Sequence, residues 1–465
     1  MKTILAVLAL FVLVLHAAAQ APSIASLSND DTGKRVLAYF DAFNSDEPEK
    51  LLAFFTENLS PDALKQRPAE PRAAFHKKVR SDLGKVRLES IVSIGSEEIK
   101  VIGRSANGGA VDYTFGIAPD RKLTMVAVQP MDAPAQRPTV TVPAPSSAAE
   151  LPQAVTGLLD SLAKDDKFSG VAFVSKDGSP VVAKAWGMAD ASRNAPNRVD
   201  TKFNLGSINK LFTRIAIGQL VKAGKLTFED KLSKVLPDYP NKAVADRITI
   251  GQIVTMRSGL GDFINDKYWT SDKSKLRSIK DYLPLFVDAP LEFEPGTRDR
   301  YSNAGYLVLG LVIEKLSGQS YYEYVSKNIF QPAGMKDTDS FALEALPANT
   351  AIGYMTKGAA KGRVPNANDQ PMRGSSAGGG YSTAEDLVRL AGALKAGKLF
   401  VPGDDGSVSG EFRGVGIAGG SEGVNALFAT NPTSGYTVVL LSNYDPPSAE
   451  GPGRIILDWV KAFAK

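Results

Sequence analysis

The sequence predicts an α+β protein of two domains joined by a proline-rich linker. Apolar residues recur at helical spacing near the start of the chain and give way to short β-rich runs up to residue 128. Prolines are frequent among small residues at 131–149, which indicates a stiff linker. Because 465 residues exceed one ordinary core, we expect a small α+β domain at 25–130 and a larger domain at 150–465.

Residues 1–21 have the layout of a cleaved secretory signal. Lys2 precedes an apolar run over 4–15, and alanines at 17–19 precede Gln20. The run is shorter than the roughly 20 residues that a membrane helix needs. An uncleaved N-terminal anchor is the alternative. We expect an exported protein, periplasmic or secreted, with no membrane span after signal cleavage.

The composition excludes several classes of function. The chain has no cysteine, which excludes disulfides, thiolate nucleophiles and Cys-ligated metals. A formal net charge of +4, with Lys and Arg scattered among acids, indicates no nucleic-acid partner. His16 lies in the expected signal, so a Ser-His-Asp triad depends on His76 alone and zinc sites of the HExxH kind are excluded. We expect no metal and no cofactor, and acyl transfer must use Ser or Thr activated by Lys, Tyr or a carboxylate.

The order of elements differs between the two domains. In the small domain helices come first, over 33–58, and β-rich runs follow at 91–94, 99–102, 111–117 and 123–128. In the larger domain helices and hairpins bracket a largely helical middle. Its outer elements are a helix at 151–162, a hairpin of 170–174 with 181–186, a hairpin of 424–430 with 436–441, and a helix through 455–463.

Two places carry a serine followed three residues later by a lysine. The pattern alone indicates no chemistry, because it arises by chance in a chain of this length. Ser161 and Lys164 lie in an amphipathic helix among charged residues, which predicts a surface position.

Ser207 and Lys210 have a different context. Ser207 starts a helix that ends near Ala223 and Gly224, and a spacing of three places its hydroxyl beside the Lys210 amine. Gly206 allows a close approach of the chain, and the helix N-terminus favours developing negative charge. A lysine kept neutral by burial or by nearby cations takes the serine proton. The alternative is that Ser207 is an N-cap and Lys210 a solvated side chain.

Several ordered motifs accompany this pair. They are Ser207 to Lys210, Ser258-Gly259-Leu260, Tyr301 to Asn303, Pro332 to Met335, Gly378 to Leu387, and Leu441 to Tyr444. With these motifs, residues 150–465 resemble the serine β-lactamase and penicillin-binding-protein superfamily, and within it the class C-like and esterase branch. The resemblance implies a β-lactamase-like fold, with an antiparallel sheet flanked by terminal helices and a helical subdomain.

The resemblance also implies roles for individual residues. Ser207 attacks the acyl carbon, Lys210 and Tyr301 relay its proton, and Asn303 holds the amide or ester region of the substrate. Tyr301 is alternatively a core aromatic residue. Since a phenol has a pKa of about 10, the relay needs cations near Tyr301. The expected partner is a small acyl substrate, namely an ester, a D-amino-acid peptide or a β-lactam.

The superfamily's strand motif is Lys-Thr-Gly, or His-x-Gly-Gly in the similar branch, and here it reads Ile417-Ala418-Gly419-Gly420. The glycines remain, so the N–H of Gly420 joins that of Ser207 as an expected oxyanion hole, with Gly419 and Ile417 as substrate contacts. Isoleucine removes a carboxylate anchor, which puts efficient turnover of β-lactams in doubt. Arg413 is a candidate substitute if the strand extends that far.

Two hypotheses of function follow. The first is an exported serine hydrolase that forms an acyl-enzyme, with esters as first choice and peptidase or β-lactamase activity next. The second is a degenerate relative that binds cell-wall or small-molecule ligands without turnover. The leading domain resembles the NTF2-like cone domains, which implies either a ligand in its hollow or a spacer or assembly module.

Overall fold

The computed structural model describes residues 24–47, 49–106, 109–130, 142–356, 362–403 and 412–463. The chain divides into two compact units, with the boundary between residues 133 and 134. The expected signal at 1–21 and most of the expected linker at 131–149 lie outside the described residues. Among the described residues, no helix has the length and apolar character needed to cross a membrane.

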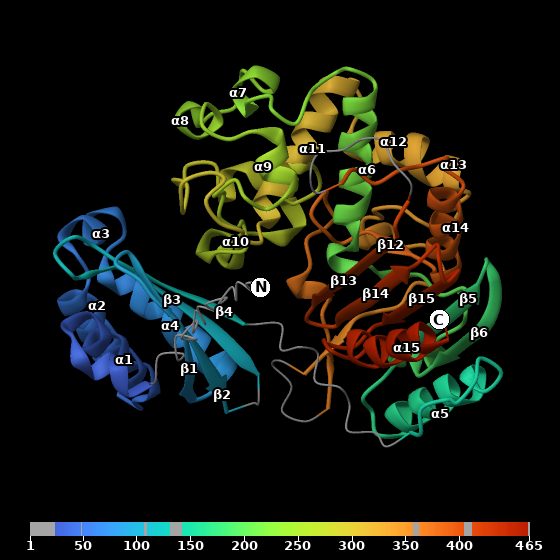
Figure 1. The fold of residues 1–465 in the computed structure, drawn as a ribbon, viewed down its shortest axis with the longest axis horizontal. Helices are drawn as coiled ribbons and strands as arrows, with labels where there is room; N and C mark the ends of the chain where they lie inside the picture. The colour runs from blue at the N-terminus through green and yellow to red at the C-terminus, as the bar shows by residue number, and fades with distance from the viewer. Residues whose placement is uncertain are drawn as a thin grey trace, which may run out of the picture. The chain divides into compact units, whose positions relative to one another are not determined.

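The first unit has helices followed by a four-stranded antiparallel sheet of order β1-β2-β3-β4, as expected from the sequence (Figure 1). Its elements are η1 (Ile24–Asn29), α1 (Asp31–Asn44), α2 (Glu49–Asn58), α3 (Pro61–Gln66), α4 (Ala69–Leu83), β1 (Val86–Ile94), β2 (Glu98–Ser105), β3 (Ala110–Ile117) and β4 (Leu123–Pro130).

Aromatic rings fill the space between these helices and their sheet. Tyr39 of α1 is fully buried and its ring lies 5.3 Å from that of Phe115 and 5.7 Å from that of Tyr113. Tyr39 Oη also lies 2.7 Å from Nδ1 of His76, whose pKa burial lowers to about 3. His76 is therefore buried in the aromatic core of the first unit.

The second unit is built on a five-stranded antiparallel sheet of order β13-β14-β15-β5-β6. The expected hairpins and terminal helices are all present. They comprise α5 (Leu151–Lys164), β5 (Gly170–Lys176), β6 (Ser179–Trp186), β13 (Val415–Ser421), β14 (Val424–Thr430), β15 (Tyr436–Ser442) and α15 (Glu450–Ala462).

The inner strands β14, β15 and β5 are buried on both faces because helices cover each face of the sheet (Figure 1). Val438 and Leu440 of β15 belong to the core formed with α5 and α15. Their neighbours Val439 and Leu441 belong to the larger core formed with the helical middle of the unit. Successive residues of β15 therefore point alternately into the two cores, and the strand packs against the helices on both faces of the sheet.

The helical middle contains many short elements. In chain order they are β7 (Met188–Asp190), η2 (Ala191–Arg193), β8 (Ala195–Pro196), β9 (Phe203–Asn204), η3 (Gly206–Ile208), α6 (Asn209–Lys222), α7 (Leu232–Val235), α8 (Lys242–Ala245), α9 (Ile250–Val254), α10 (Asp266–Thr270), η4 (Lys273–Lys275), η5 (Ile279–Leu285), α11 (Asn303–Ser317), α12 (Tyr321–Val325), η6 (Ser326–Phe330), α13 (Gln331–Ala333), η7 (Leu343–Ala345), β10 (Tyr354–Met355), β11 (Val364–Pro365), η8 (Ala367–Asp369), β12 (Tyr381–Ser382) and α14 (Ala384–Lys395). Helix α6 contributes many residues to the large core and ends at Lys222 with Ala223 as its C-cap, close to the end expected from the sequence.

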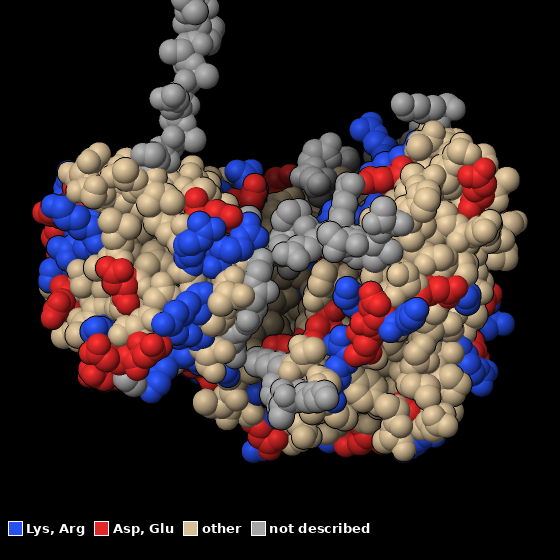
Figure 2. Space-filling view, turned by 90° about the horizontal axis from the view of Figure 1, so that it is seen from below, with Lys and Arg blue, Asp and Glu red and all other residues tan. Residues whose placement is uncertain are grey.

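Charged side chains of both signs are interspersed on the face of each unit that Figure 2 shows. Most of the surface ion pairs are short-range or exposed, such as that between Lys184 Nζ and Asp160 Oδ1 at 2.8 Å. This distribution agrees with the mild net charge of +4.

Candidate active site

Ser207 lies in the turn η3 between the short strand β9 and helix α6. The turn is held because Gly206 donates its N–H to Asn204 Oδ1 at 2.9 Å. Gly206 has a φ of 51°, and a Cβ at this position would stand 2.8 Å from the backbone nitrogen of Gly420. Only glycine therefore lets the turn approach strand β13 so closely.

Three of the expected site residues meet at the Ser207 hydroxyl. Ser207 Oγ lies 2.6 Å from Tyr301 Oη, and Lys210 Nζ donates to Ser207 Oγ at 3.1 Å. Lys210 Nζ also lies 4.8 Å from the centre of the Tyr301 ring. Tyr301 is 48% exposed, so the alternative of a core aromatic residue is wrong.

Lys210 is buried, with 3% of its surface exposed, and is not a solvated side chain. Its Nζ donates to Asn303 Oδ1 at 2.7 Å and to the carbonyl of Ala377 at 2.5 Å. Burial lowers the pKa of Lys210 to about 7, although the negative charge of Asp262 acts in the other direction and raises it. A substantial fraction of this amine is therefore neutral near pH 7 and able to accept a proton. Of the two expected routes to a neutral lysine, burial is the one found.

Asp262 is a site residue that sequence reasoning missed. It accepts from the side-chain Nδ2 of Asn303 at 2.8 Å and from its backbone N–H at 3.3 Å. A chain of hydrogen bonds thus runs from Lys210 through Asn303 to a buried carboxyl group whose pKa is raised by desolvation. The only signal in the sequence is its place two residues after the motif Ser258-Gly259-Leu260.

Strand β13 passes directly beside the turn that carries Ser207. A Cβ on Gly419 would lie 2.1 Å from the carbonyl oxygen of Leu205 and 2.8 Å from the backbone nitrogen of Ser207. The strand therefore needs glycine here, and the backbones of Ser207 and Gly420 are held next to one another. This is the arrangement of neighbouring main-chain groups that an oxyanion hole requires.

Ile417 of β13 lines a cavity of 580 Å³ together with Ser207, Lys210 and Tyr301. Arg413 was expected to substitute for the missing cation only if the strand extended to it, and it does not. Strand β13 begins at Val415. Gly414, which has a φ of 106°, lies between Arg413 and the strand.

Two other arginines line the same cavity. Arg214, one turn beyond Lys210 on α6, donates to the carbonyl of Pro402 at 2.9 Å. Arg257 also lines this cavity, and its Nε lies 3.2 Å from Asp299 Oδ1. The cationic side chains of this cavity therefore come from the helical middle and not from the strand.

A second cavity, of 150 Å³, also has Ser207 in its lining. Gly420 and Asn303 contribute to its lining, and so do the aromatic residues Phe263, Tyr268, Trp269 and Tyr282. Ser207 is thus common to two cavities: the first has three cationic residues in its lining, and the second has four aromatic residues together with the acidic Asp369 and Glu422.

Residues 155–462 match the family model described as Beta-lactamase. The chain belongs to the β-lactamase family. The fold and the family expected from the motifs are therefore confirmed, and so, at the level of the family, is the expectation of a serine hydrolase.

Relatives in this family carry different names. Penicillin-binding protein 4* of Bacillus subtilis is 32% identical over 203 residues, which are 43% of this chain and 44% of that protein. Esterase EstB of Burkholderia gladioli is 29% identical over 310 residues, which are 58% of this chain and 78% of that protein. The match thus spans less than half of the first relative and most of the second.

Solved structures show the same fold. A penicillin-binding protein from Bacillus halodurans is 34% identical with a TM-score of 0.57, covering 65% of this chain and 99% of that one. D-amino acid amidase from Ochrobactrum anthropi, at 22% identity and a TM-score of 0.58, covers 67% of this chain and 99% of that one. The second likeness concerns the fold alone.

Proposed function

We propose that this protein is an exported serine hydrolase that cleaves esters through an acyl-enzyme on Ser207. The observation that carries the proposal is the position of Ser207 Oγ, within hydrogen-bond distance of both Lys210 Nζ and Tyr301 Oη. A hydroxyl, a buried amine and a phenol in mutual contact are the parts that base-activated nucleophilic catalysis requires.

In the first half of the reaction, neutral Lys210 takes the proton of Ser207, directly or through Tyr301, while Oγ bonds to the acyl carbon. The carbonyl oxygen becomes an oxyanion that the backbone N–H groups of Ser207 and Gly420 stabilise. When the tetrahedral intermediate collapses, the bond to the leaving oxygen breaks and the same proton passes to that oxygen. Water then repeats the sequence on the acyl-enzyme, releasing the acid and restoring Ser207.

Two features support esters as the first choice among acyl donors. Ile417 places an alkyl group in the cavity beside Ser207, where a carboxylate-binding strand residue is absent. Esterase EstB is a relative that matches over 78% of its own length. D-amino-acid peptides and β-lactams come next. Asn303 has one amide N–H beyond those bound to Asp262 and is placed to hold the acyl region of any of them.

The proposal requires a covalent adduct on one serine. A fluorophosphonate probe or a fluorescent penicillin is expected to label the purified, folded protein once, and peptide mapping by mass spectrometry is expected to locate the label on Ser207. Ser161, which has the same spacing to Lys164, provides an internal control and is expected to carry no label. Absence of any adduct in a folded sample favours the non-catalytic hypothesis, and an adduct on another residue shows a different nucleophile; either result removes this proposal.

The pH dependence of ester hydrolysis is expected to report Lys210. Because the base form is active and burial lowers its pKa to about 7, kcat/KM is expected to rise with pH through about 7 and then level off. Asp262 raises the pKa of Lys210, so Asp262→Asn is expected to move this rise to lower pH. The pH of this rise in the wild type and in Asp262→Asn is measured from rate profiles between pH 5 and 10 with p-nitrophenyl acetate, corrected for spontaneous hydrolysis.

The matched control is Asp266→Asn, which neutralises an exposed carboxylate on α10. It is expected to leave the profile unchanged. A wild-type profile that is flat between pH 5 and 9, or an Asp262→Asn profile shifted upward, contradicts this role of Lys210.

A further inference from the structure

The geometry of proton delivery assigns the two cavities to the two halves of an ester. The leaving oxygen needs a proton from Lys210 or Tyr301, and both residues line the 580 Å³ cavity. Neither residue is among those lining the 150 Å³ cavity, which instead contains Gly420 of the expected oxyanion hole. An ester bound for this chemistry therefore directs its alcohol into the first cavity and its acyl group into the second.

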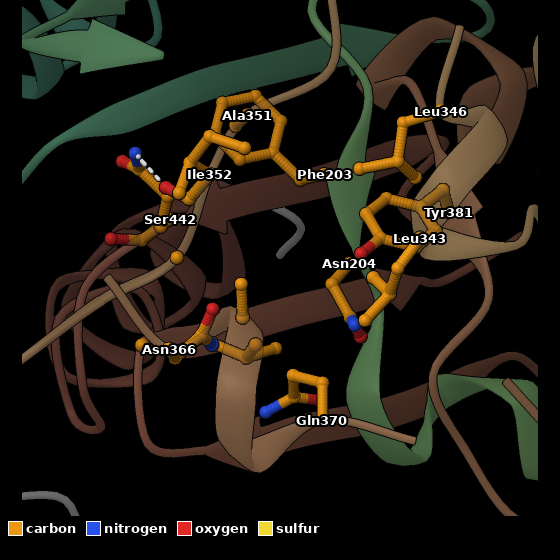
Figure 3. A pocket seen from close by; sticks show the side chains of 15 residues that line it. Phe203, Asn204, Leu343, Leu346, Ala351, Ile352, Asn366, Gln370, Tyr381 and Ser442 are labelled. Carbon is orange, nitrogen blue, oxygen red and sulfur yellow. Dashed lines mark hydrogen bonds between the residues drawn. The ribbon is translucent and has the colours of Figure 1, made fainter. Parts of the chain in front are cut away.

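The acyl cavity adjoins a third, more enclosed pocket of 110 Å³. Asn204 and Gln370 line both of them, so the two cavities share this part of their walls. In Figure 3 these two side chains lie on the side of the pocket away from Ala351. Its apolar lining comes from Phe203, Leu343, Leu346, Ala351, Ile352 and Tyr381.

We propose that this pocket receives the end of an aliphatic acyl chain, so that the enzyme prefers esters of medium-chain carboxylic acids. The inference rests on the proposed function, because it needs an acyl group bound to Ser207. An apolar cavity of about 150 Å³ holds benzene. By the same measure, a pocket of 110 Å³ holds about four carbon atoms beyond those in the acyl cavity.

Three side-chain donors at the pocket wall bind to the protein itself, whereas the buried Oδ1 of Asn443 has no hydrogen-bond partner among the described residues. Asn366 Nδ2 donates to the carbonyl of Glu422 at 2.7 Å, and Asn443 Nδ2 donates to that of Ile352 at 2.8 Å, the latter drawn in Figure 3. Ser442 Oγ donates to the carbonyl of Ser169 at 2.8 Å. Because these donors are already bound, an alkyl chain does not leave them unsatisfied, as it would if they pointed free into the pocket.

The test compares p-nitrophenyl esters from acetate to decanoate on the full chain. For the wild type, kcat/KM is expected to rise by roughly fourfold per methylene, the ratio for burying one methylene at about 0.8 kcal/mol, until the chain fills the pocket. Ala351→Leu adds three carbons to the pocket wall and is expected to move the optimum to shorter chains. Leu346→Ala removes three carbons and is expected to move it to longer chains.

The acetate ester is the reference for each variant, because its acyl group ends before the pocket. Its kcat/KM is expected to stay within about twofold of the wild-type value. Opposite shifts in the two variants cannot come from a general loss of folding. A chain-length profile that is the same in all three proteins, with acetate hydrolysis intact, overturns the acyl-chain pocket while leaving the proposed function in place. If no ester is cleaved and no adduct forms on Ser207, the proposed function itself fails, and this inference fails with it.

Discussion

Ser207→Ala is expected to lower kcat for p-nitrophenyl acetate by about 10⁴-fold or more, because the only route to the acyl-enzyme is removed. The remaining groups would still bind substrate and polarise its carbonyl, so a small rate above the uncatalysed one is expected to persist. Ser207 Oγ is the shared partner of Lys210 and Tyr301. Removing it leaves both of them in place, and the melting temperature is expected to change little.

The chain offers a matched control for this substitution in its second Ser-x-x-Lys motif. Ser161→Ala changes the same residue type in the same local pattern, near the end of α5, and is expected to retain wild-type rates. Initial rates under substrate excess, with single-turnover measurements to separate acylation from turnover, measure the effect. Rates in the Ser207→Ala protein within tenfold of the wild type would show that another residue is the nucleophile.

Local patterns allowed much of the second unit to be predicted. The hairpin of β5 and β6 has apolar runs on either side of Asp177 and Gly178, whose positive φ values of 48° and 84° fit a tight turn. The terminal helices carry an apolar stripe at helical spacing. By contrast, β9 and β12 are two residues long and pair across the chain at Asn204 and Tyr381, which no local period indicates.

The same distinction applies to the site. Ser207 and Lys210 lie one helical turn apart, so their contact follows from spacing alone. Asp262 reaches Lys210 only through Asn303, and that contact depends on how separate segments pack. The pocket beyond Asn204 likewise combines residues from segments far apart in sequence. The extent of β13 was also not predictable, because a change of backbone direction at Gly414 decides where it starts.

The second large effect on activity is expected from a substitution in strand β13, where it passes close to the turn that carries Ser207. Gly419→Ala is expected to lower kcat by about 10³-fold, since its Cβ would lie 2.1 Å from the carbonyl oxygen of Leu205 and 2.8 Å from the nitrogen of Ser207. Both are backbone atoms, so the turn and the strand must move apart. That movement separates the two N–H groups that we propose stabilise the oxyanion, and loss of one such donor costs about 10²- to 10³-fold in kcat.

Gly416→Ala is the matched control, because a Cβ at Gly416 on the same strand meets nothing within 4 Å. It is expected to keep the wild-type kcat and the wild-type rate of fluorophosphonate labelling. Circular dichroism and the melting temperature separate a displaced site from an unfolded protein, and for Gly419→Ala a folded protein with slow labelling is expected. A Gly419→Ala protein that labels and turns over like the Gly416→Ala protein would show that the oxyanion is not stabilised between the turn and strand β13.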